Sequence, residues 1–482
     1  MAEKVSTLSS IEILNSTINN SLFRFLLRIL SGFCKKDGKS RIETALELYT
    51  DATDSACFTC SHIVHPIVKW AVRRGAKAFD VGEEDIKEKL SDVYWRRGLA
   101  DVVRGVAKFG VRRPFVPSAP FLVVWNYTWL CNLRCKHCYA SAGKAHTDEL
   151  SSREALDTVG KLADAGVTII AFSGGEPLMR RDFFDTLQAA HDHGIFTAIA
   201  TNGTLMTREV TKKIKDSGVG YVQISLDGAK PETHDDFRGV PGAYERTIKG
   251  IRNCVEQGVF VEVSTTGTKY SYKEIPDIID LCERLGVDWW MLFNFVPSGR
   301  GRFIVENDLT PEEREEVLRY LWQRLKSNGK VEVLSTAPQF ARVSLQMEED
   351  AKLKAGDNEV IIPTHFYNPR LHGQLVNLSE FIGGCGAGRF YCALDPDGTI
   401  TPCVFFPLKV GNIRDDDFED VWDNPVFWEL RDRDKLKGHC GRCEYRYVCG
   451  GCRARAYGYF GDYLAPDPGC INNLDLWEKL KR

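Results

Sequence analysis

The chain has 482 residues, of which 43% are hydrophobic and 27% are charged, and its formal net charge is −3. The near-neutral charge argues against a nucleic-acid partner, and the length is sufficient for about three domains. No apolar run reaches the ~20 residues that span a bilayer, and the first residues do not have the layout of a secretory signal.

The chain contains 16 cysteines, which is a high count, and most of them gather in two places. Without a secretory signal, this distribution favours metal binding in a reducing, cytoplasmic compartment over disulfide bonds.

Residues 1–115 are predicted to form a helical, amphipathic N-terminal extension. In residues 21–33, SLFRFLLRILSGF, apolar side chains recur at helical spacing around Arg24 and Arg28. Such a helix either docks on its own protein or lies in a membrane interface, which would place the chain peripherally on the inner face of a membrane. Residues 102–115 are also basic and apolar, and they favour the membrane alternative.

Several cysteines of the chain are expected to be packed thiols, namely Cys34, Cys254 and Cys282. The segment CFTCSHIVH at 57–65 contains Cys57, Cys60, His62 and His65 within nine residues. These four residues either bind a metal or belong to a helix in which they lie close together without one, and the second interpretation is preferred.

Residues 116–335 are predicted to form an α/β core, in which short strands rich in β-branched residues alternate with helices. The expected strands are 121–127, 167–175, 196–203, 221–228, 259–267 and 289–296, and the expected helices are 151–164, 182–193, 207–217, 243–257 and 273–285. This alternation predicts a parallel sheet, either open or curled into a barrel. Functional residues in such sheets lie at the C-terminal ends of the strands.

A further helix is predicted to begin at LTPEEREEV, residues 309–317, with Thr310 as its N-cap and Glu313 completing a capping box. Residues 336–384 are expected to form a linker. Residues 385–482 are rich in cysteine, glycine and turns, and a domain of this kind usually needs a metal to hold it together.

The motif CxxxCxxC, formed by Cys131, Cys135 and Cys138, directly follows the first expected strand. A structural zinc site takes four protein ligands, usually from paired CxxC turns. An iron–sulfur cube held by three thiolates instead leaves one iron open to a further ligand. The motif therefore favours an open iron–sulfur cluster.

This motif, with SGGEP at 173–177 after the second strand, resembles the signature of the radical S-adenosylmethionine (radical SAM) enzymes. The resemblance implies a partial (β/α)6 barrel, a 4Fe–4S cluster on the three cysteines and S-adenosylmethionine bound at its open iron. It also implies cleavage of that cofactor to a 5′-deoxyadenosyl radical, which removes a hydrogen atom from an unactivated carbon in an oxidoreductase- or transferase-type reaction. Reduced ferredoxin or flavodoxin would supply the electron.

The same resemblance implies a set of residues that bind S-adenosylmethionine: Gly174, Gly175, Glu176, Pro177, Asn202, Ser225, Arg238 and Thr266. Glu176 is expected to accept a hydrogen bond from the methionine ammonium group, and Ser225 to contact the ribose. Arg238 is expected to pair with the methionine carboxylate, and its alternative is a surface salt bridge with Asp235 or Asp236. Asn202 and Thr266 could instead cap a turn and a strand.

The C-terminal cysteines resemble the SPASM extension of radical SAM maturases, which carries two auxiliary 4Fe–4S clusters. By analogy, the first cluster would be held by Cys385, Cys392, Cys403 and Cys452, and the second by Cys440, Cys443, Cys449 and Cys470. Only Gly450 and Gly451 separate Cys449 from Cys452, where the family usually has three residues. Two zinc ions are the alternative occupants. Full cysteine ligation would favour electron relay by the auxiliary clusters.

The substrate class stays open at this point. Residues 449–470 look most like the branch that modifies haem-type tetrapyrroles, and Arg300, Arg302 and Arg389 are candidates for binding propionate groups. The amphipathic N-terminus favours a lipid or isoprenoid chain to the same degree, and a ribosomal peptide or protein ranks third. A non-enzymatic iron–sulfur electron carrier is the remaining alternative.

Overall fold

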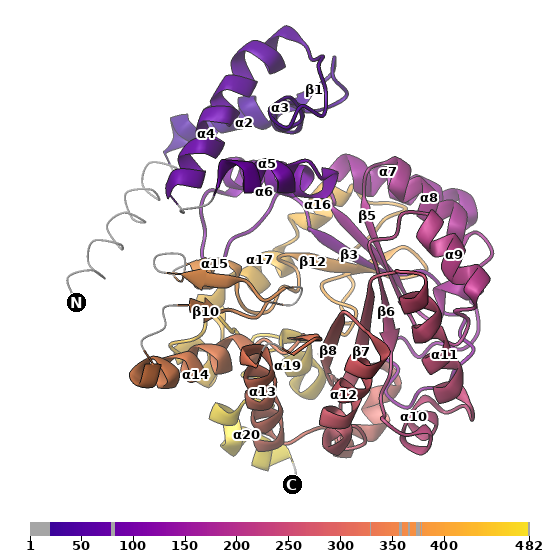
Figure 1. Cartoon of the computed structure of the whole chain (residues 1–482). Helices are drawn as coiled ribbons and strands as arrows, with labels where there is room; N and C mark the ends of the chain where they lie inside the picture. The colour runs from indigo at the N-terminus through magenta and orange to yellow at the C-terminus, as the bar shows by residue number, and fades with distance from the viewer. Residues whose placement is uncertain are drawn as a thin grey trace.

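A ten-stranded sheet forms the centre of this computed structural model, which describes residues 20–78, 82–327, 329–355, 359–364, 367–372, 376 and 378–480. The strand order is β14-β13-β12-β3-β4-β5-β6-β7-β8-β9. The strands are β3 (Leu122–Asn126), β4 (Ile169–Ser173), β5 (Phe196–Thr201), β6 (Tyr221–Ser225), β7 (Val261–Gly267), β8 (Trp289–Asn294), β9 (Glu332–Ser335), β12 (Tyr391–Leu394), β13 (Thr399–Thr401) and β14 (Gly411–Asn412). Strands β3 to β9 are parallel, so the six expected strands form the predicted open barrel (Figure 1).

Helices cover the outer face of this barrel, and all of them except α10 occur where the sequence pattern predicts a helix. They are α7 (Ser152–Ala165), α8 (Phe183–Asp192), α9 (Arg208–Asp216), α10 (Pro231–Arg238), α11 (Ala243–Glu256), α12 (Ile275–Leu285) and α13 (Pro311–Lys326). The capping box predicted at Thr310 and Glu313 is present, and Ser151 and Glu154 form a second one at α7. Buried residues of strands and helices form one large apolar core between the two layers.

From residue 20 on, the N-terminal extension is largely helical and has a small core of its own, and residues 1–19 of the predicted extension lie outside the described residues. Its elements are α2 (Ser21–Ser31), β1 (Phe33–Cys34), β2 (Lys39–Ser40), α3 (Arg41–Tyr49), the π-helical turn η1 (Cys60–Val64), α4 (His65–Ala78), α5 (Glu83–Leu90) and α6 (Val93–Phe109). In Figure 1, α6 lies between the other N-terminal helices and the barrel. Arg97 of α6 donates hydrogen bonds to the carbonyl oxygens of Ala163, Val167 and His193, and these bonds fix α6 to the connections that follow α7 and α8.

The polar side of α2 faces its own protein, and its apolar side faces outward. Arg24 and Arg28 donate to the carbonyl oxygen of Ala107 near the C-terminus of α6, where a cation is favoured. Leu22, Phe25 and other apolar side chains of α2 are exposed. Residues 102–109 do not form a surface segment, because α6 is packed on the barrel; for this stretch the membrane interpretation is wrong.

The predicted linker 336–384 contains more regular structure than expected. It begins with the helix α14 (Gln339–Ala355), which packs against α13 and buries Phe340 and Val343. A hairpin of β10 (Glu359–Ile361) and β11 (Arg370–His372) follows, and then α15 (Ser379–Ile382). The linker interpretation is therefore wrong for residues 339–355.

The cysteine-rich region continues the barrel sheet, because β12 pairs in parallel with β3 through four residue pairs, Tyr391 with Leu122 to Leu394 with Trp125. Its helices are α16 (Phe418–Trp422), α17 (Pro425–Arg431), α18 (Gly438–Arg442), α19 (Arg453–Phe460) and α20 (Leu474–Leu480). Short 3-10 turns complete the described chain: η2 (Pro177–Met179), η3 (Tyr272–Glu274), η4 (Gly299–Asn307), η6 (Arg433–Lys435) and η7 (Ile471–Asn473). Within the described residues, none of the helices combines the length and the apolarity that a bilayer crossing requires.

Candidate active site

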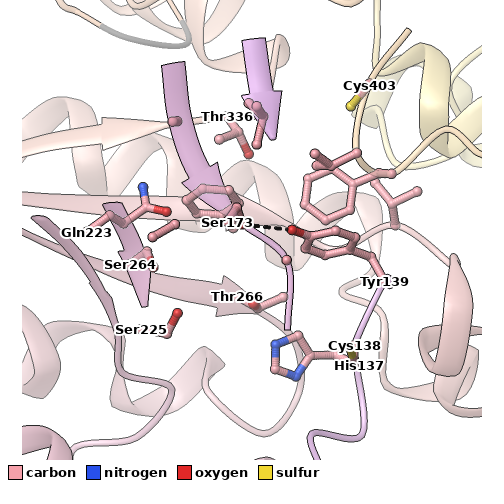
Figure 2. Close-up of a pocket in the computed structure, with 18 of the residues that line it drawn as sticks. His137, Cys138, Tyr139, Ser173, Gln223, Ser225, Ser264, Thr266, Thr336 and Cys403 are labelled. Atoms are coloured by element: carbon pink, nitrogen blue, oxygen red, sulfur yellow. Dashed lines mark hydrogen bonds between the residues drawn. The ribbon is translucent and has the colours of Figure 1, made fainter. Parts of the chain in front are cut away.

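A largely apolar cavity lies where the C-terminal ends of the barrel strands meet the cysteine-rich region. Two groups of thiols line it: Cys131, Cys135 and Cys138 from the loop after β3, and Cys385, Cys403 and Cys452 from the C-terminal region. Figure 2 shows Cys138 and Cys403 in the cavity with Tyr139 between them in this view. The sheet therefore brings together cysteines that are more than two hundred residues apart in the sequence.

The loop that carries the first thiol group is closed on itself, and each of its three sulfurs has a hydrogen-bond donor. Gly143 N donates to Trp129 O at 2.8 Å, and this bond closes the loop. The amides of Leu133 and Ala142 donate to the sulfurs of Cys131 and Cys138 at 3.5 and 3.4 Å. Arg238 Nη1 donates to Cys135 Sγ at 3.7 Å. These donors stabilise negative charge on all three sulfurs, which is what an iron–sulfur cluster requires of its ligands.

Burial makes two thiols of this group, Cys131 and Cys135, weaker acids. Burial raises the pKa of Cys131 to about 12, and it also raises the pKa of Cys135, where the nearby Arg238 guanidinium opposes the rise. Cluster binding would displace these protons, because a metal ion deprotonates a coordinating thiol outright. The three sulfurs with their donors therefore fit an iron–sulfur cluster.

Arg238 is buried against the cavity wall and does not form the surface salt bridge that was its alternative role. Its Nη2 lies 2.5 Å from Asp227 Oδ2. Burial pushes the pKa of Asp227 up, but the Arg238 guanidinium, together with smaller effects such as the hydrogen bond from the Thr266 amide, holds the pKa below its usual range. His137 stacks on Phe237 with ring centroids 4.2 Å apart, and burial lowers its pKa to about 3, so the ring is neutral at physiological pH. The charge beside Cys135 therefore comes from Arg238.

The glycines of the SGGEP segment are required by the neighbouring cysteine loop. A Cβ atom on Gly175 would lie 2.1 Å from the carbonyl oxygen of Leu130, and one on Gly174 would lie 2.7 Å from that of Thr128. The amide of Gly175 donates to Thr128 O at 2.7 Å, and the amide of Glu176 donates to Leu130 O at 2.8 Å. Only glycine permits this contact, which sets the position of the cysteine loop relative to β4. Both glycines also line the cavity.

Glu176 and Pro177 are buried beneath the cavity and are not among its lining residues. Both carboxylate oxygens of Glu176 accept from the Thr201 hydroxyl, at 2.8 and 2.9 Å, and one accepts from the amide of Asn202 at 2.9 Å. Burial raises the pKa of this carboxyl to about 7, although these hydrogen bonds oppose the rise. Glu176 thus joins the ends of β4 and β5, and its predicted contact with the methionine ammonium group stays a prediction.

The other predicted cofactor-binding residues, Asn202, Ser225 and Thr266, line the cavity from three strand ends. Asn202 Nδ2 donates to Asn132 Oδ1 at 2.8 Å, which links β5 to the cysteine loop. The amide of Thr266 donates to Asp227 Oδ1 at 2.7 Å. These residues surround the first thiol group as expected, and their contacts with S-adenosylmethionine stay predictions.

Tyr139 was not singled out by the sequence as a site residue, although it directly follows Cys138. Its hydroxyl donates to Asn126 Oδ1 at 2.9 Å and lies 3.0 Å from Ser173 Oγ, as Figure 2 shows for the second contact. Asn126 in turn donates to Asp395 Oδ1 of the C-terminal region at 2.7 Å. This chain of hydrogen bonds crosses the boundary between the barrel and the cysteine-rich region.

The structure does not bring Cys392 to the other cysteines assigned to the first auxiliary cluster. Cys392 follows Tyr391 in β12, and successive side chains of a strand point to opposite faces. The hydroxyl of Tyr391 donates to Cys403 Sγ at 3.4 Å, so Cys392 points away from that sulfur. The assignment of Cys392 is therefore corrected: Cys385, Cys403 and Cys452 form a group of three thiols.

The four cysteines assigned to the second auxiliary cluster lie in one region of the C-terminal domain, and their role as its ligands stays a prediction. Burial raises the pKa of Cys443, Cys449 and Cys470, and the nearby sulfur of Cys440 adds to the rise in each of the three. Asp467 N donates to Cys440 Sγ and Gly451 N donates to Cys449 Sγ, each at 3.4 Å. Gly450 and Gly451 have φ of 68° and 65°, and this left-handed turn accommodates the short spacing before Cys452.

The three arginines proposed for propionate groups differ in their accessibility. Arg389 is fully buried and donates to the backbone carbonyls of Phe115, Phe381, Ile382 and Gly383, so its assignment to a substrate is wrong. Arg300 lines the cavity and donates to the carbonyls of Cys135 and Ala142. Arg302, two residues further along the chain, is exposed.

Comparison with known proteins agrees with this geometry. Residues 125–282 match the radical SAM superfamily, and residues 385–444 match an iron–sulfur cluster-binding domain. The chain is 39% identical over 357 residues to the AdoMet-dependent heme synthase of Methanosarcina barkeri, which covers 73% of this chain and 97% of that protein. It is 31% identical over 361 residues to the mycofactocin maturase MftC of Mycobacterium ulcerans, covering 73% and 88%. The structure of Streptococcus suis SuiB bound to S-adenosylmethionine shares the fold, with a TM-score of 0.59 at 19% identity over 89% of this chain and 92% of that one.

Proposed function

The chain belongs to the radical SAM superfamily and carries an iron–sulfur cluster-binding domain, and on this basis we propose that it removes a hydrogen atom from a haem-type tetrapyrrole. The observation that carries the proposal is the shared cavity, into which the CxxxCxxC thiols and three thiols of the C-terminal domain both open. The relative with 39% identity is a heme synthase, which supports the tetrapyrrole as substrate class.

The residues around the first thiol group would hold the cofactors and exclude water from them. Cys131, Cys135 and Cys138 would bind the cluster, and Asn202, Ser225, Arg238 and Thr266 would surround S-adenosylmethionine. When bound, the cluster and S-adenosylmethionine supply the radical that removes the hydrogen atom. Arg238 would keep the charge beside Cys135 positive, because its guanidinium does not lose its proton at physiological pH. The apolar cavity walls would keep water away from the reacting position.

The substrate would occupy the space between the two thiol groups. Tyr139, Phe293 and Phe405 line this part of the cavity, and their rings suit a flat conjugated molecule. Arg300 on the wall and the exposed Arg302 would receive propionate groups. With three thiols, Cys385, Cys403 and Cys452 would leave one auxiliary iron without a cysteine ligand, and that iron would face the substrate.

The test is cofactor cleavage by the anaerobically purified protein, followed by a comparison of substrates. With a reduced flavodoxin or ferredoxin as electron donor, the protein should form 5′-deoxyadenosine. Cys135→Ala should abolish this product while the auxiliary iron stays bound. A propionate-bearing iron porphyrin should raise the rate of product formation and acquire a mass change, and an isoprenoid or a peptide should do neither. Absence of cleavage in the fully loaded protein would favour an electron carrier instead.

A lipid or isoprenoid substrate is the second candidate, and the outward apolar face of the N-terminal extension favours it. Leu22, Phe25 and Ile29 of α2 and Trp70 of α4 are 67%, 56%, 48% and 62% exposed. Arg74 and Lys77 of α4 are exposed as well, and basic residues beside apolar ones favour an anionic membrane surface. We propose that this face contacts the cytoplasmic side of a membrane peripherally.

Vesicle sedimentation tests this contact. Phe25→Glu combined with Ile29→Glu should weaken binding to anionic vesicles by at least about tenfold, because each side chain loses about 1.5–3 kcal/mol of apolar transfer energy. Leu156→Glu on α7 is the control, since Leu156 is also exposed but lies on the barrel. Equal binding by the wild type and the double variant would rule out the contact.

A further inference from the structure

A compact group of metal-binding side chains lies in the N-terminal extension, outside both matched family regions. It consists of Cys34, Asp37, Cys57 and Cys60, and we call it the Cys34 cluster. One ligand atom from each residue lies within 4.8 Å of all the others. Cys34 and Cys60 are buried, and Asp37 and Cys57 are partly buried. Among the described residues outside the two iron–sulfur regions, no other such group occurs.

The backbone holds the four residues in two tight turns of the same spacing, CxxD and CxxC. Cys34 and Asp37 lie in the turn between β1 and β2, which is closed by a hydrogen bond from Gly38 N to Cys34 O at 2.8 Å. Gly38 has φ of 70°, a conformation that favours glycine. Cys60 begins η1, a π-helical turn, and Cys57 lies three residues before it; such turns are frequent at functional sites. Paired turns of this kind are typical of zinc sites.

The two turns are joined at the cluster. The amide of Cys57 donates to Asp37 Oδ1 at 2.8 Å, and Cys34 Sγ lies 3.5 Å from Cys57 Sγ. The amide of Cys60 donates to Cys57 Sγ at 3.5 Å. Asp37 Oδ2 is shielded from solvent and receives no N–H or O–H donor, so the weak S–H donors of the cluster thiols are what face this carboxylate when no cation is bound.

The spacing of the ligand atoms favours a single ion over an iron–sulfur cube. Four ligands at about 2.3 Å from one zinc lie about 3.8 Å apart, close to the separation of the Cys34 and Cys57 sulfurs. A four-iron cube places its thiolates on separate iron atoms and therefore further apart. Three thiolates and a carboxylate exceed the charge of a divalent ion, and Lys35 and Lys36 lie between the ligands of the first turn.

The nearby histidines do not join the cluster. His62 is exposed and stacks on Phe58 with ring centroids 4.6 Å apart. His65 lies in the first turn of α4 and is not within reach of the thiols. Cys34 is buried, as expected of a packed thiol, and its sulfur faces that of Cys57.

We propose that Cys34, Asp37, Cys57 and Cys60 bind one Zn²⁺ in a closed tetrahedral site that joins the β1–β2 turn to the start of η1. The small core of the extension gives a physical reason for such a site, since short helical units with few buried residues are often held together by a metal. The site takes no part in the proposed reaction, so its test is independent of that proposal.

Metal analysis of the full chain, purified anaerobically with its iron–sulfur clusters, tests the proposal. The wild type should contain one zinc per chain in addition to its iron. In the double variant Cys34→Ser and Cys57→Ser, the zinc content per chain should fall at least tenfold, and the iron content should stay the same. Cys254→Ala combined with Cys282→Ala is the matched control, since both are buried thiols of the barrel helices, and it should keep the zinc. Failure of S-adenosylmethionine cleavage would leave these results unchanged.

A spectroscopic measurement covers the case in which the double variant does not fold. Co²⁺ exchanged into the wild type should show thiolate-to-cobalt charge-transfer bands and the visible bands of tetrahedral cobalt. Asp37→Cys should strengthen the charge-transfer bands, because a fourth thiolate replaces the carboxylate. The proposal is overturned by a wild type without zinc or cobalt bands, by iron in place of zinc at this site, by a Cys34–Cys57 disulfide in the anaerobic protein, or by a double variant that retains its zinc.

Discussion

At the level of single residues, substitutions of Cys392 and Cys403 can show which thiols bind the first auxiliary cluster. Cys403→Ala should lose about four iron atoms per chain, the content of one 4Fe–4S cluster, because it removes one of three ligands. Cys392→Ala should keep its iron, since this thiol points to the opposite face of β12. Iron analysis of both variants, with the cluster signals in electron paramagnetic resonance, checks this. Equal iron loss in the two variants would restore Cys392 as a ligand.

Glu262 should make stability depend on pH. Burial raises the pKa of this carboxyl to about 7 from 4.5, although a hydrogen bond from Gln223 opposes the rise. The folded state therefore binds the proton more tightly than the unfolded chain, and stability falls as the pH rises from about 4.5 to about 7. Glutamine at this position resembles the protonated form of Glu262. Above pH 7, the free energy of unfolding of Glu262→Gln should therefore be higher than that of the wild type by on the order of 3 kcal/mol. Denaturant unfolding at pH 6 and 8.5 should show a larger difference between the two proteins at pH 8.5.

At the level of elements, two glycines of α6 should respond in opposite ways to the same substitution. A Cβ atom on Gly105 would lie 2.7 Å from the backbone oxygen of Val116, whereas one on Gly98 meets no atom within 4 Å. Gly98→Ala should stabilise the protein by up to about 1 kcal/mol, the difference in helix propensity. Gly105→Ala should destabilise it by about 1–3 kcal/mol, because α6 must move away from the chain at 116. Thermal unfolding of both variants checks the signs, and a stabilising Gly105→Ala would show that α6 is not held there.

The sequence predicts elements well where the pattern is local. The six barrel strands and most of their helices can be predicted from alternating apolar runs. The motif CxxxCxxC identifies Cys131, Cys135 and Cys138 because all three ligands lie within eight consecutive residues. The pairing of β12 with β3 could not be predicted, since the two strands are far apart in the chain. The Cys34 cluster could have been found from the matching spacings CxxD and CxxC, but a carboxylate in the first turn is easily passed over.

At the level of the whole molecule, the C-terminal domain completes both the sheet and the cavity. A chain ending at residue 384 would expose the edge of β3, and exposed edges of apolar strands promote aggregation. We expect this shortened chain to be largely insoluble. The full chain with Cys403→Ser is the control, because it weakens a cluster but keeps β12. Sedimentation and size-exclusion chromatography check the outcome, and a monomeric shortened chain would show that the barrel is stable without β12.

The pairing of β12 with β3 also has a consequence for biosynthesis. Residue 391 leaves the ribosome 269 residues after residue 122, its partner in the sheet. At typical rates of translation, this separates the two strands by roughly 15 to 50 seconds. One edge of β3 therefore has no partner strand while more than half of the protein is synthesised. Assembly of the cavity, and loading of its metal clusters, must follow translation of the last quarter of the chain.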